Sequence, residues 1–237
     1  VFDPESAKDG ISLQLPMYSL FISEDKTFNT YKLGGLFIQP LFRTSEFVKD
    51  NKAWLDDYAC FKVLKKIYKD TPWTEFPTEL KNRDKVILDK FKLKHSKELN
   101  KIKFIQYIAN KQWQDIKAYA NSKGIKVFGD MPFYIELDSA DVWSNPKNWK
   151  LDANGKGDKA GVPPDYFNSE GQLWGNPLYN WDKLEEDGFA FWLDRLAYNA
   201  QLFDRIRIDH FRAFDTYWKI PASCPTAIEG EWVEAPG

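Results

Sequence analysis

The sequence predicts an α/β protein, because two strand-like stretches each follow a helix-like segment. The first stretch, IKVFGDMPFYI (residues 125–135), comes directly after Gly124, which is well placed to end the preceding helix. The second, RIRIDHF (residues 205–211), comes after a helix expected over about residues 182–203. Strands joined through a helix are expected to be parallel, with a right-handed crossover.

The region from about residue 45 to residue 123 is predicted to be helical. Apolar residues recur there at steps of three and four, as in an amphipathic helix. In the first helix they are Trp54, Leu55, Tyr58, Phe61, Leu64 and Ile67. The prolines of TPWTEFP (71–77) end that helix. In a longer helix over 100–124 the stripe comprises Ile102, Ile105, Ile108, Trp113, Ile116 and Ala120.

The first strand is expected to begin with Ile125, Val127 and Phe128 and to end near Asp130, because Pro132 cannot continue the ladder. A long loop rich in Gly, Pro, Asp and Asn is expected over 136–181. Loops of this length are uncommon in compact domains and are usually functional or disordered. Because the loop carries many aromatic residues that need packing partners, we expect it to be ordered.

Composition excludes several classes of function. A net charge of −2 over 237 residues provides no basic surface for nucleic acid. No apolar run approaches the ~20 residues of a membrane span, and the first ten residues do not resemble a signal peptide. The two cysteines, Cys60 and Cys224, lack metal-ligand spacing, so we expect no metal, no disulfide framework and a reducing cytoplasm.

Charged residues occupy one face of the second strand near its end. Strand side chains alternate, so Ile206 and Ile208 should face covering helices while Arg207 and Asp209 face the other way. In α/β barrels the carboxyl ends of strands carry the chemistry. Asp130 has the same position at the end of the first strand. Two acids and an arginine are therefore expected to converge.

This arrangement suits glycosidic chemistry. Arg207 lies ~6–7 Å from Asp209 along the strand and favours the ionised carboxylate that a glycosidic nucleophile requires. The structural alternative, to which spacing gives equal weight, is a buried ion pair that closes a barrel layer. His210 is a candidate for a hydrogen bond to a substrate hydroxyl, whereas His95 is expected to be solvated.

The stretch GVPPDYFNSEGQLWGNPLYNW (residues 161–181) mixes aromatic rings with amides and carboxylates. Rings can stack on sugar faces while polar groups bind hydroxyls. The candidate substrate contacts are Asp165, Tyr166, Phe167, Gln172, Trp174 and Asn176. Gly171 and Gly175 flank Trp174 and would let the loop hinge. The alternative is that the rings only fix the loop to the core, which we favour for Tyr179 and Trp181.

Several motifs occur together in order: GDMPFYI, DSADVW, AGVPPDYFNSEGQLWGNPLYNW, RIRIDHFRAFDTYWKIPA and TAIEGEWVEAPG. They resemble the 4-α-glucanotransferases, also called amylomaltases or disproportionating enzymes, of the α-amylase clan. The resemblance covers roughly residues 48–237. It implies a partial (β/α)8 TIM barrel with a helical insertion: an insertion over 48–100, and barrel over 101–237 with a lid loop at about 152–181. Residues 1–47 stay unassigned.

By this resemblance Asp209 is the nucleophile that forms a covalent glucosyl-enzyme, and Arg207 orients and ionises it. His210 contacts the sugar at the bond being cleaved, and Asp130 supports the site. The mobile lid contains Tyr166, Phe167 and Trp174. The implied reaction transfers α-1,4-glucan segments between malto-oligosaccharides with retention and without a cofactor.

Two family features lack a match. The acid/base glutamate and a second aspartate are not found, and Glu229, Glu231 and Glu234 lie in no matching motif. The chain is therefore expected to be a central, catalytically incomplete piece of the enzyme. The alternatives are an α-amylase-like hydrolase and a non-catalytic glucan-binding remnant.

Overall fold

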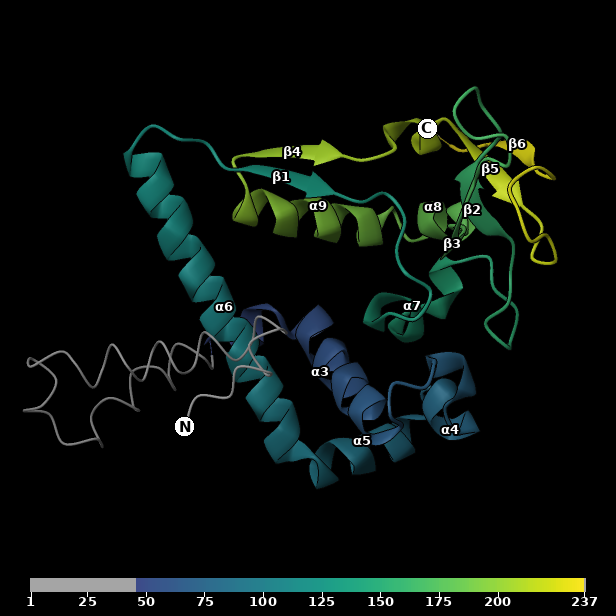
Figure 1. Cartoon of the computed structure of the whole chain (residues 1–237). Coiled ribbons are helices and arrows are strands. Elements are labelled where there is room, and N and C mark those ends of the chain that lie inside the picture. Colours follow the sequence, from purple (N-terminus) through teal and green to yellow (C-terminus); the bar gives the residue numbers. More distant parts are fainter. Residues whose placement is uncertain (1–45, 237) are drawn as a thin grey trace, which may run out of the picture. The chain divides into compact units, whose positions relative to one another are not determined.

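The computed structural model describes residues 46–236, and Asn51–Gly237 form one unit. This unit is a mixed helix and strand structure, as predicted (Figure 1). Its described strands form a two-stranded parallel sheet, β1–β4, and a four-stranded antiparallel sheet in the order β3-β2-β5-β6. The segment 1–45 lies outside the described residues, so most of the unassigned N-terminal region is not tested.

The elements follow one another in chain order. The helices are α3 (Lys52–Ile67), α4 (Thr78–Lys81), α5 (Lys85–Lys94), α6 (Ser96–Ser122), α7 (Ala140–Ser144), α8 (Trp181–Glu186) and α9 (Ala190–Leu202). The strands are β1 (Phe128–Met131), β2 (Lys159–Val162), β3 (Gln172–Pro177), β4 (Arg205–Ile208), β5 (Thr216–Ile220) and β6 (Glu231–Glu234). Short 3-10 turns are η2 (Trp73–Glu75), η3 (Pro146–Asn148) and η4 (Phe211–Phe214).

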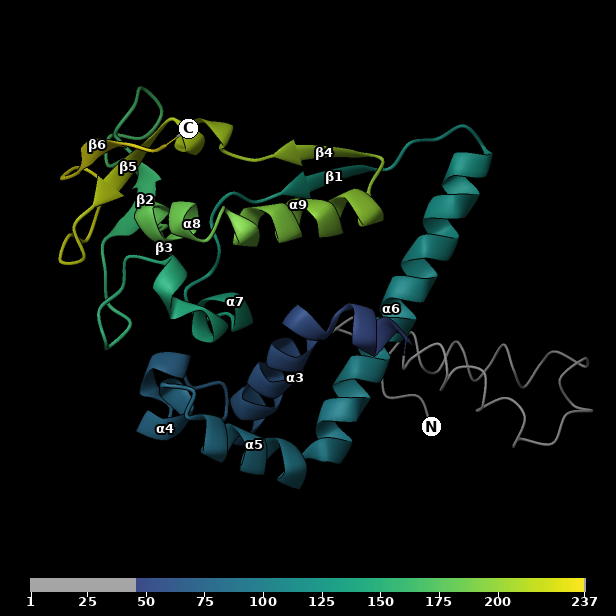
Figure 2. The ribbon, with the colours of Figure 1, turned by 180° about the vertical axis from the view of Figure 1, so that it is seen from behind.

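The pairing of β1 with β4 confirms the predicted parallel strands. Asp130 lies opposite Arg207 in the register, and α9 runs along the strand pair in both views (Figures 1 and 2). Ile206 and Ile208 pack against the hydrophobic core, whereas Arg207 is exposed, so the predicted alternation is confirmed.

The start of the first strand was predicted too early. β1 begins at Phe128, and Ile125 is 60% exposed. The Asp204 carboxylate accepts hydrogen bonds from the Asn121 side chain and the Val127 amide, both at less than 3 Å. These bonds hold the chain between α6 and β1 in an extended turn. Ladder pairing therefore starts only where Val127 offers its carbonyl to Asp204 and Arg205.

The segment 136–181 is more regular than the expected loop. It contains α7 and η3, and β2 and β3 lie within the predicted lid at 152–181. β2 pairs with both β3 and β5, which places this segment inside the four-stranded sheet. The loop composition concealed these strands because β2 is only KAGV and β3 contains both glycine and proline.

The single helix expected over 182–203 is two helices. α8 ends at Glu186, and α9 begins at Ala190. Gly188 and Phe189 both have positive φ, 64° and 56°, which breaks the helical path. This conformation is unusual for a bulky residue such as Phe189, whose ring packs against the hydrophobic core.

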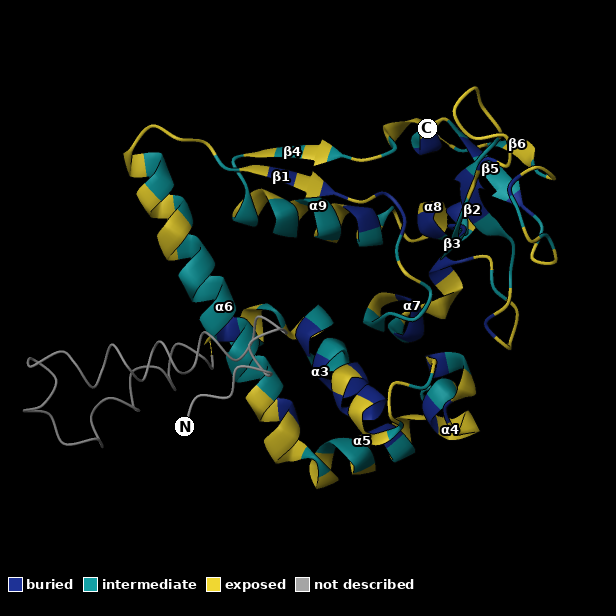
Figure 3. Ribbon diagram, viewed as in Figure 1, coloured by how far each residue is buried: buried dark blue, intermediate teal, exposed yellow. Residues whose placement is uncertain are grey.

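The region before β1 is helical, as predicted. α3 contacts α6 and α7, and Leu55, Phe61 and Leu64 on its apolar face are buried (Figure 3). The stripe on α6 is less covered than its periodicity predicts. The described residues leave Ile116 61% exposed, and Ile67 at the end of α3 is 43% exposed.

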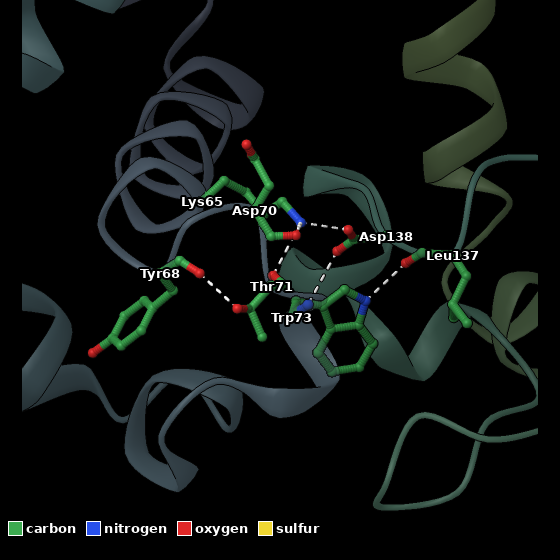
Figure 4. Close-up of polar contacts among 7 residues, drawn as sticks. All are labelled: Lys65, Tyr68, Asp70, Thr71, Trp73, Leu137 and Asp138. Carbon is green, nitrogen blue, oxygen red and sulfur yellow. Dashed lines mark hydrogen bonds and ion pairs between the residues drawn. The ribbon is translucent and has the colours of Figure 1, made fainter.

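A polar junction connects α3 to the segment that follows β1 (Figure 4). The buried Lys65 ammonium donates to the carbonyls of Asp70 and Thr71 and, at 2.5 Å, to the Asp138 carboxylate. The other Asp138 oxygen accepts from the Trp73 amide, and the Trp73 indole donates to the Leu137 carbonyl. The end of α3, the residues that follow it, and the segment after β1 thus share one set of hydrogen bonds.

None of the described helices has the length and apolar character needed to cross a membrane.

Candidate active site

Arg207 binds two carboxylates at the ends of neighbouring strands. One guanidinium nitrogen lies 2.8 Å from Asp130 Oδ2, and the other lies 2.7 Å from Asp209 Oδ1. The parallel register makes this possible, because it sets Asp130 opposite Arg207 while Asp209 follows β4 directly. The Asp209 amide also donates to the Met131 carbonyl at 2.9 Å. The convergence predicted from the sequence is therefore present in the structure.

The three charged side chains are open to solvent in the described part of the chain. Arg207, Asp130 and Asp209 are 54%, 57% and 56% exposed. Ion pairs with this exposure contribute little to stability, typically about 0–1 kcal/mol. In the described part of the chain both carboxylates are therefore accessible to solvent.

His210 lies beside this group in an unusual conformation. Its φ is 53°, in the left-handed region that few non-glycine residues occupy. Its ring meets Trp174 edge to face, with centroids 4.9 Å apart. Burial lowers the pKa of His210 despite the nearby Asp209 charge, so the ring is neutral at pH 7. Nε2 is shielded from solvent and has no hydrogen-bond partner among the described residues. Such strained and unsatisfied groups are concentrated at functional sites.

A bulge in β3 presents Trp174 to His210. Leu173 pairs with Gly161 and Pro177 pairs with Lys159, so β3 has two more residues than β2 over this interval. Gly175 lies in the extra stretch with φ 80°, which a residue with a side chain rarely adopts. The Trp174 indole donates to Gln172 at 3.0 Å. The glycine therefore shapes a bulge within a paired strand, and this differs from the free hinge expected from sequence.

Two aromatic rings project from the turn that joins β2 to β3. Tyr166 and Phe167 are 97% and 93% exposed, and their rings are perpendicular with centroids 5.5 Å apart. One oxygen of the Asp165 carboxylate accepts from the amides of Phe167 and Asn168, both at 2.8 Å. Asp165 thus closes the turn that presents the two rings, and its direct contact with substrate stays a prediction.

The structure groups some of the predicted site residues and not others. Asp130, Arg207 and Asp209 form one cluster. A second cluster consists of Gln172, Trp174 and His210: the Trp174 indole donates a hydrogen bond to Gln172, and its ring contacts the His210 ring. The two clusters are joined through the backbone, because His210 directly follows Asp209. No hydrogen bond, ion pair or ring contact between described residues connects Asp165, Tyr166, Phe167 or Asn176 to the carboxylates.

Sequence reasoning missed Tyr134. Its ring lies 6.0 Å from Trp174 and 6.2 Å from His210, and it stacks on Tyr179 at an interplanar angle of 16°. Burial raises its pKa, so it stays neutral at pH 7. The signal was its position four residues after Asp130 in the segment that leaves the carboxyl end of β1. Within the described residues no cluster of three or more His, Cys, Asp or Glu side chains is arranged to hold a metal.

Comparisons with known proteins place these features in one family. The 4-alpha-glucanotransferase family model matches residues 39–237. A 4-alpha-glucanotransferase of Thermus thermophilus is 49% identical over 78% of this chain and 37% of its own length. One from Aquifex aeolicus is 44% identical over 81% of this chain and 40% of its own length.

A solved structure shows the same similarity in three dimensions. The amylomaltase from Streptococcus agalactiae in complex with acarbose matches with a TM-score of 0.80 and 37% identity, over 84% of this chain and 40% of that chain. The present chain thus spans about two fifths of the length of these relatives. By its sequence motifs, by the family model and by its fold, the chain belongs to the 4-alpha-glucanotransferase family.

Proposed function

We propose that the natural protein containing this sequence is a 4-alpha-glucanotransferase that moves α-1,4-glucan segments between malto-oligosaccharides. The observation that carries the proposal is the Arg207 guanidinium between Asp209 and Asp130, at the carboxyl ends of two adjacent parallel strands. The solved relative holds acarbose, a sugar-like molecule, which supports a glucan substrate.

Asp209 is assigned as the nucleophile. Its carboxylate attacks the anomeric carbon, the bond to the leaving oxygen breaks, and that oxygen takes a proton from an acid. The 4-hydroxyl of a second glucan then attacks the glucosyl-enzyme, loses its proton to the same group and frees Asp209. Retention requires two carboxyl groups ~5–5.5 Å apart. The family resemblance gives the acid role to a glutamate that no described residue matches.

The other residues bind and shield the sugar. Arg207 holds the Asp209 carboxylate in place through their ion pair, while Asp130 and His210 offer polar groups to hydroxyls. Trp174 is a stacking platform beside them. Tyr166 and Phe167, on the exposed turn between β2 and β3, form a lid that excludes water while an acceptor binds. Asp165, Gln172 and Asn176 complete the proposed glucan contacts.

The sheet β1–β4 with α9 is proposed to be part of a (β/α)8 barrel, with the helices α3–α5 as an insertion. The parallel pairing and the covering helix support this assignment. Barrel enzymes build their sites at the carboxyl ends of the strands, which is where the Arg207 cluster lies.

Product analysis with maltotriose tests the function. The natural protein should give longer oligosaccharides together with glucose. Glucose and maltose alone would indicate an α-amylase-like hydrolase. Tight maltodextrin binding without turnover would instead indicate a non-catalytic glucan-binding protein.

Replacing Trp174 with Ala is expected to lower the ratio of transfer to hydrolysis products about tenfold. Stacking of a nucleic-acid base on an aromatic side chain is worth ~1–3 kcal/mol, and stacking of a sugar ring should be worth that much or less. Without the ring, water competes better with the acceptor for the glucosyl-enzyme. Trp54→Ala is the control, since Trp54 is also partly buried and, among the described rings, meets only Tyr58 and Tyr198, both edge to face. An unchanged product ratio in Trp174→Ala would assign Trp174 to packing alone.

A further inference from the structure

We propose that Arg195 on α9 is a positioning residue that fixes the backbone immediately beyond Asp130 and thereby places Asp130 against Arg207. The proposal rests on the proposed function and adds a residue from outside the sugar-contacting groups. It assigns Arg195 no contact with substrate.

The Arg195 guanidinium binds two successive carbonyls. One nitrogen donates to the Phe133 carbonyl at 3.0 Å, and the other donates to the Pro132 carbonyl. The guanidinium also lies over the Trp192 ring, 5.1 Å from the centroid. A planar fork of donors suits two neighbouring acceptors, and stacking on an aromatic ring restricts its orientation. The Arg195 side chain is therefore restricted in orientation, and it fixes the backbone at Pro132 and Phe133.

The bound carbonyls lie where the sheet no longer fixes the strand. The β1–β4 ladder ends with Met131 opposite Ile208, and Pro132 has no amide with which to continue it. Beyond that point the carbonyl of the buried Phe133 needs another partner, because an unsatisfied buried carbonyl is costly. Arg195 supplies these hydrogen bonds two residues after Asp130.

A second donor acts on the same carbonyl. The buried Tyr179 hydroxyl donates to the Phe133 carbonyl at 2.7 Å, and Arg195 lies 3.5 Å from that hydroxyl. The segment that follows β3 and the helix α9 therefore converge on the turn after β1.

The fixed turn carries groups on both sides of the site. Asp130 precedes it and shares the Arg207 guanidinium with Asp209. Tyr134 follows it and forms ring contacts with Trp174 and His210. A shift of this turn by a fraction of an ångström would move the Asp130 carboxylate and the Tyr134 ring together. Misplacement by ~1 Å can cost about 10²-fold in rate.

The test compares Arg195→Met, Arg195→Lys and Lys183→Met in the natural protein that contains this sequence. Lys183→Met removes a cation that forms exposed ion pairs with Glu186 and Asp187 on α8, so it controls for the loss of a surface charge. The measurements are kcat and KM with maltotriose, melting temperature, and hydrogen–deuterium exchange of peptides covering 128–136.

For Arg195→Met we expect kcat to fall at least about tenfold with KM changed less than about threefold, because placement of the reacting groups is lost while binding contacts remain. Exchange in peptides covering 128–136 should become faster by about threefold or more. Arg195→Lys should recover part of kcat, because an ammonium keeps the charge and reaches one carbonyl. Lys183→Met should match the wild type in kcat and in exchange over 128–136.

A lower melting temperature with unchanged kcat would make Arg195 merely structural and overturn the proposal. So would unchanged exchange over 128–136, or a loss of kcat shared equally by Lys183→Met. A wild-type protein without transferase activity would instead count against the proposed function, and the exchange measurement would still decide whether Arg195 fixes the turn.

Discussion

Replacing Asp209 with Asn is expected to reduce turnover of the natural protein by about 10⁴-fold or more, the scale of nucleophile removal in other enzymes. The amide keeps the size of the carboxylate and loses the charge and the nucleophilic oxygen. The cost in folding should be small, because Asp209 is 56% exposed and an amide oxygen can still accept from Arg207. Steady-state rates with maltotriose and thermal melting together separate loss of chemistry from loss of fold.

Ile208→Asn is the matched comparison one residue earlier. Ile208 faces the core, so an amide there loses apolar contacts and lies unpaired at a cost of about 1–3 kcal/mol. This variant should melt earlier than the wild type. If Ile208→Asn melts like the wild type, the assignment of the strand faces is wrong. If Asp209→Asn keeps more than about a tenth of the rate, the assignment of Asp209 as the nucleophile is wrong.

Replacing Lys65 with Met is expected to cause the largest loss of stability, about 3 kcal/mol. The ammonium is buried and satisfies two carbonyls and the Asp138 carboxylate (Figure 4). Methionine fills similar space and leaves all three acceptors without that donor. The melting temperature should fall by roughly 5–10 °C.

The neighbouring Lys66 provides the control, because it is exposed on the same helix and Lys66→Met makes the same chemical change. Its melting temperature should stay within about 1 °C of the wild type. Asp138→Asn should lie between the two variants, since an amide oxygen can still accept from the Trp73 amide. Equal melting of Lys65→Met and Lys66→Met would show that the junction does not stabilise the fold.

The carboxyl ends of the two parallel strands were predictable because local rules determine them. Alternation along RIRID set Arg207 and Asp209 on one face, and the helix between the strands predicted parallel pairing. Each strand has an aspartate at its carboxyl end, and the observed register places Asp130 opposite Arg207. His210 and Trp174 were identified from their residue types and motifs, but their mutual contact was not.

The features that escaped prediction depend on distant partners. β2 and β3 are short and each contains a glycine, and they exist as strands because β2 pairs with β5 about 60 residues later. The bulge at Gly175 depends on the pairing of β3 with β2. Arg195 gave no local signal of function, because it lies on an ordinary helical pattern, and the only signal for Tyr134 was its position four residues after Asp130. Their importance comes from contacts across the fold.

The most direct test of the central claim is to trap the covalent intermediate and locate it. The natural protein would be incubated with a fluorinated glucosyl donor, digested and analysed by mass spectrometry. We predict one glucosyl adduct, in the peptide that contains Asp209, and none at that position in Asp209→Asn. An active protein whose adduct lies on another residue, or an adduct that persists in Asp209→Asn, would contradict the assignment of Asp209 as the nucleophile.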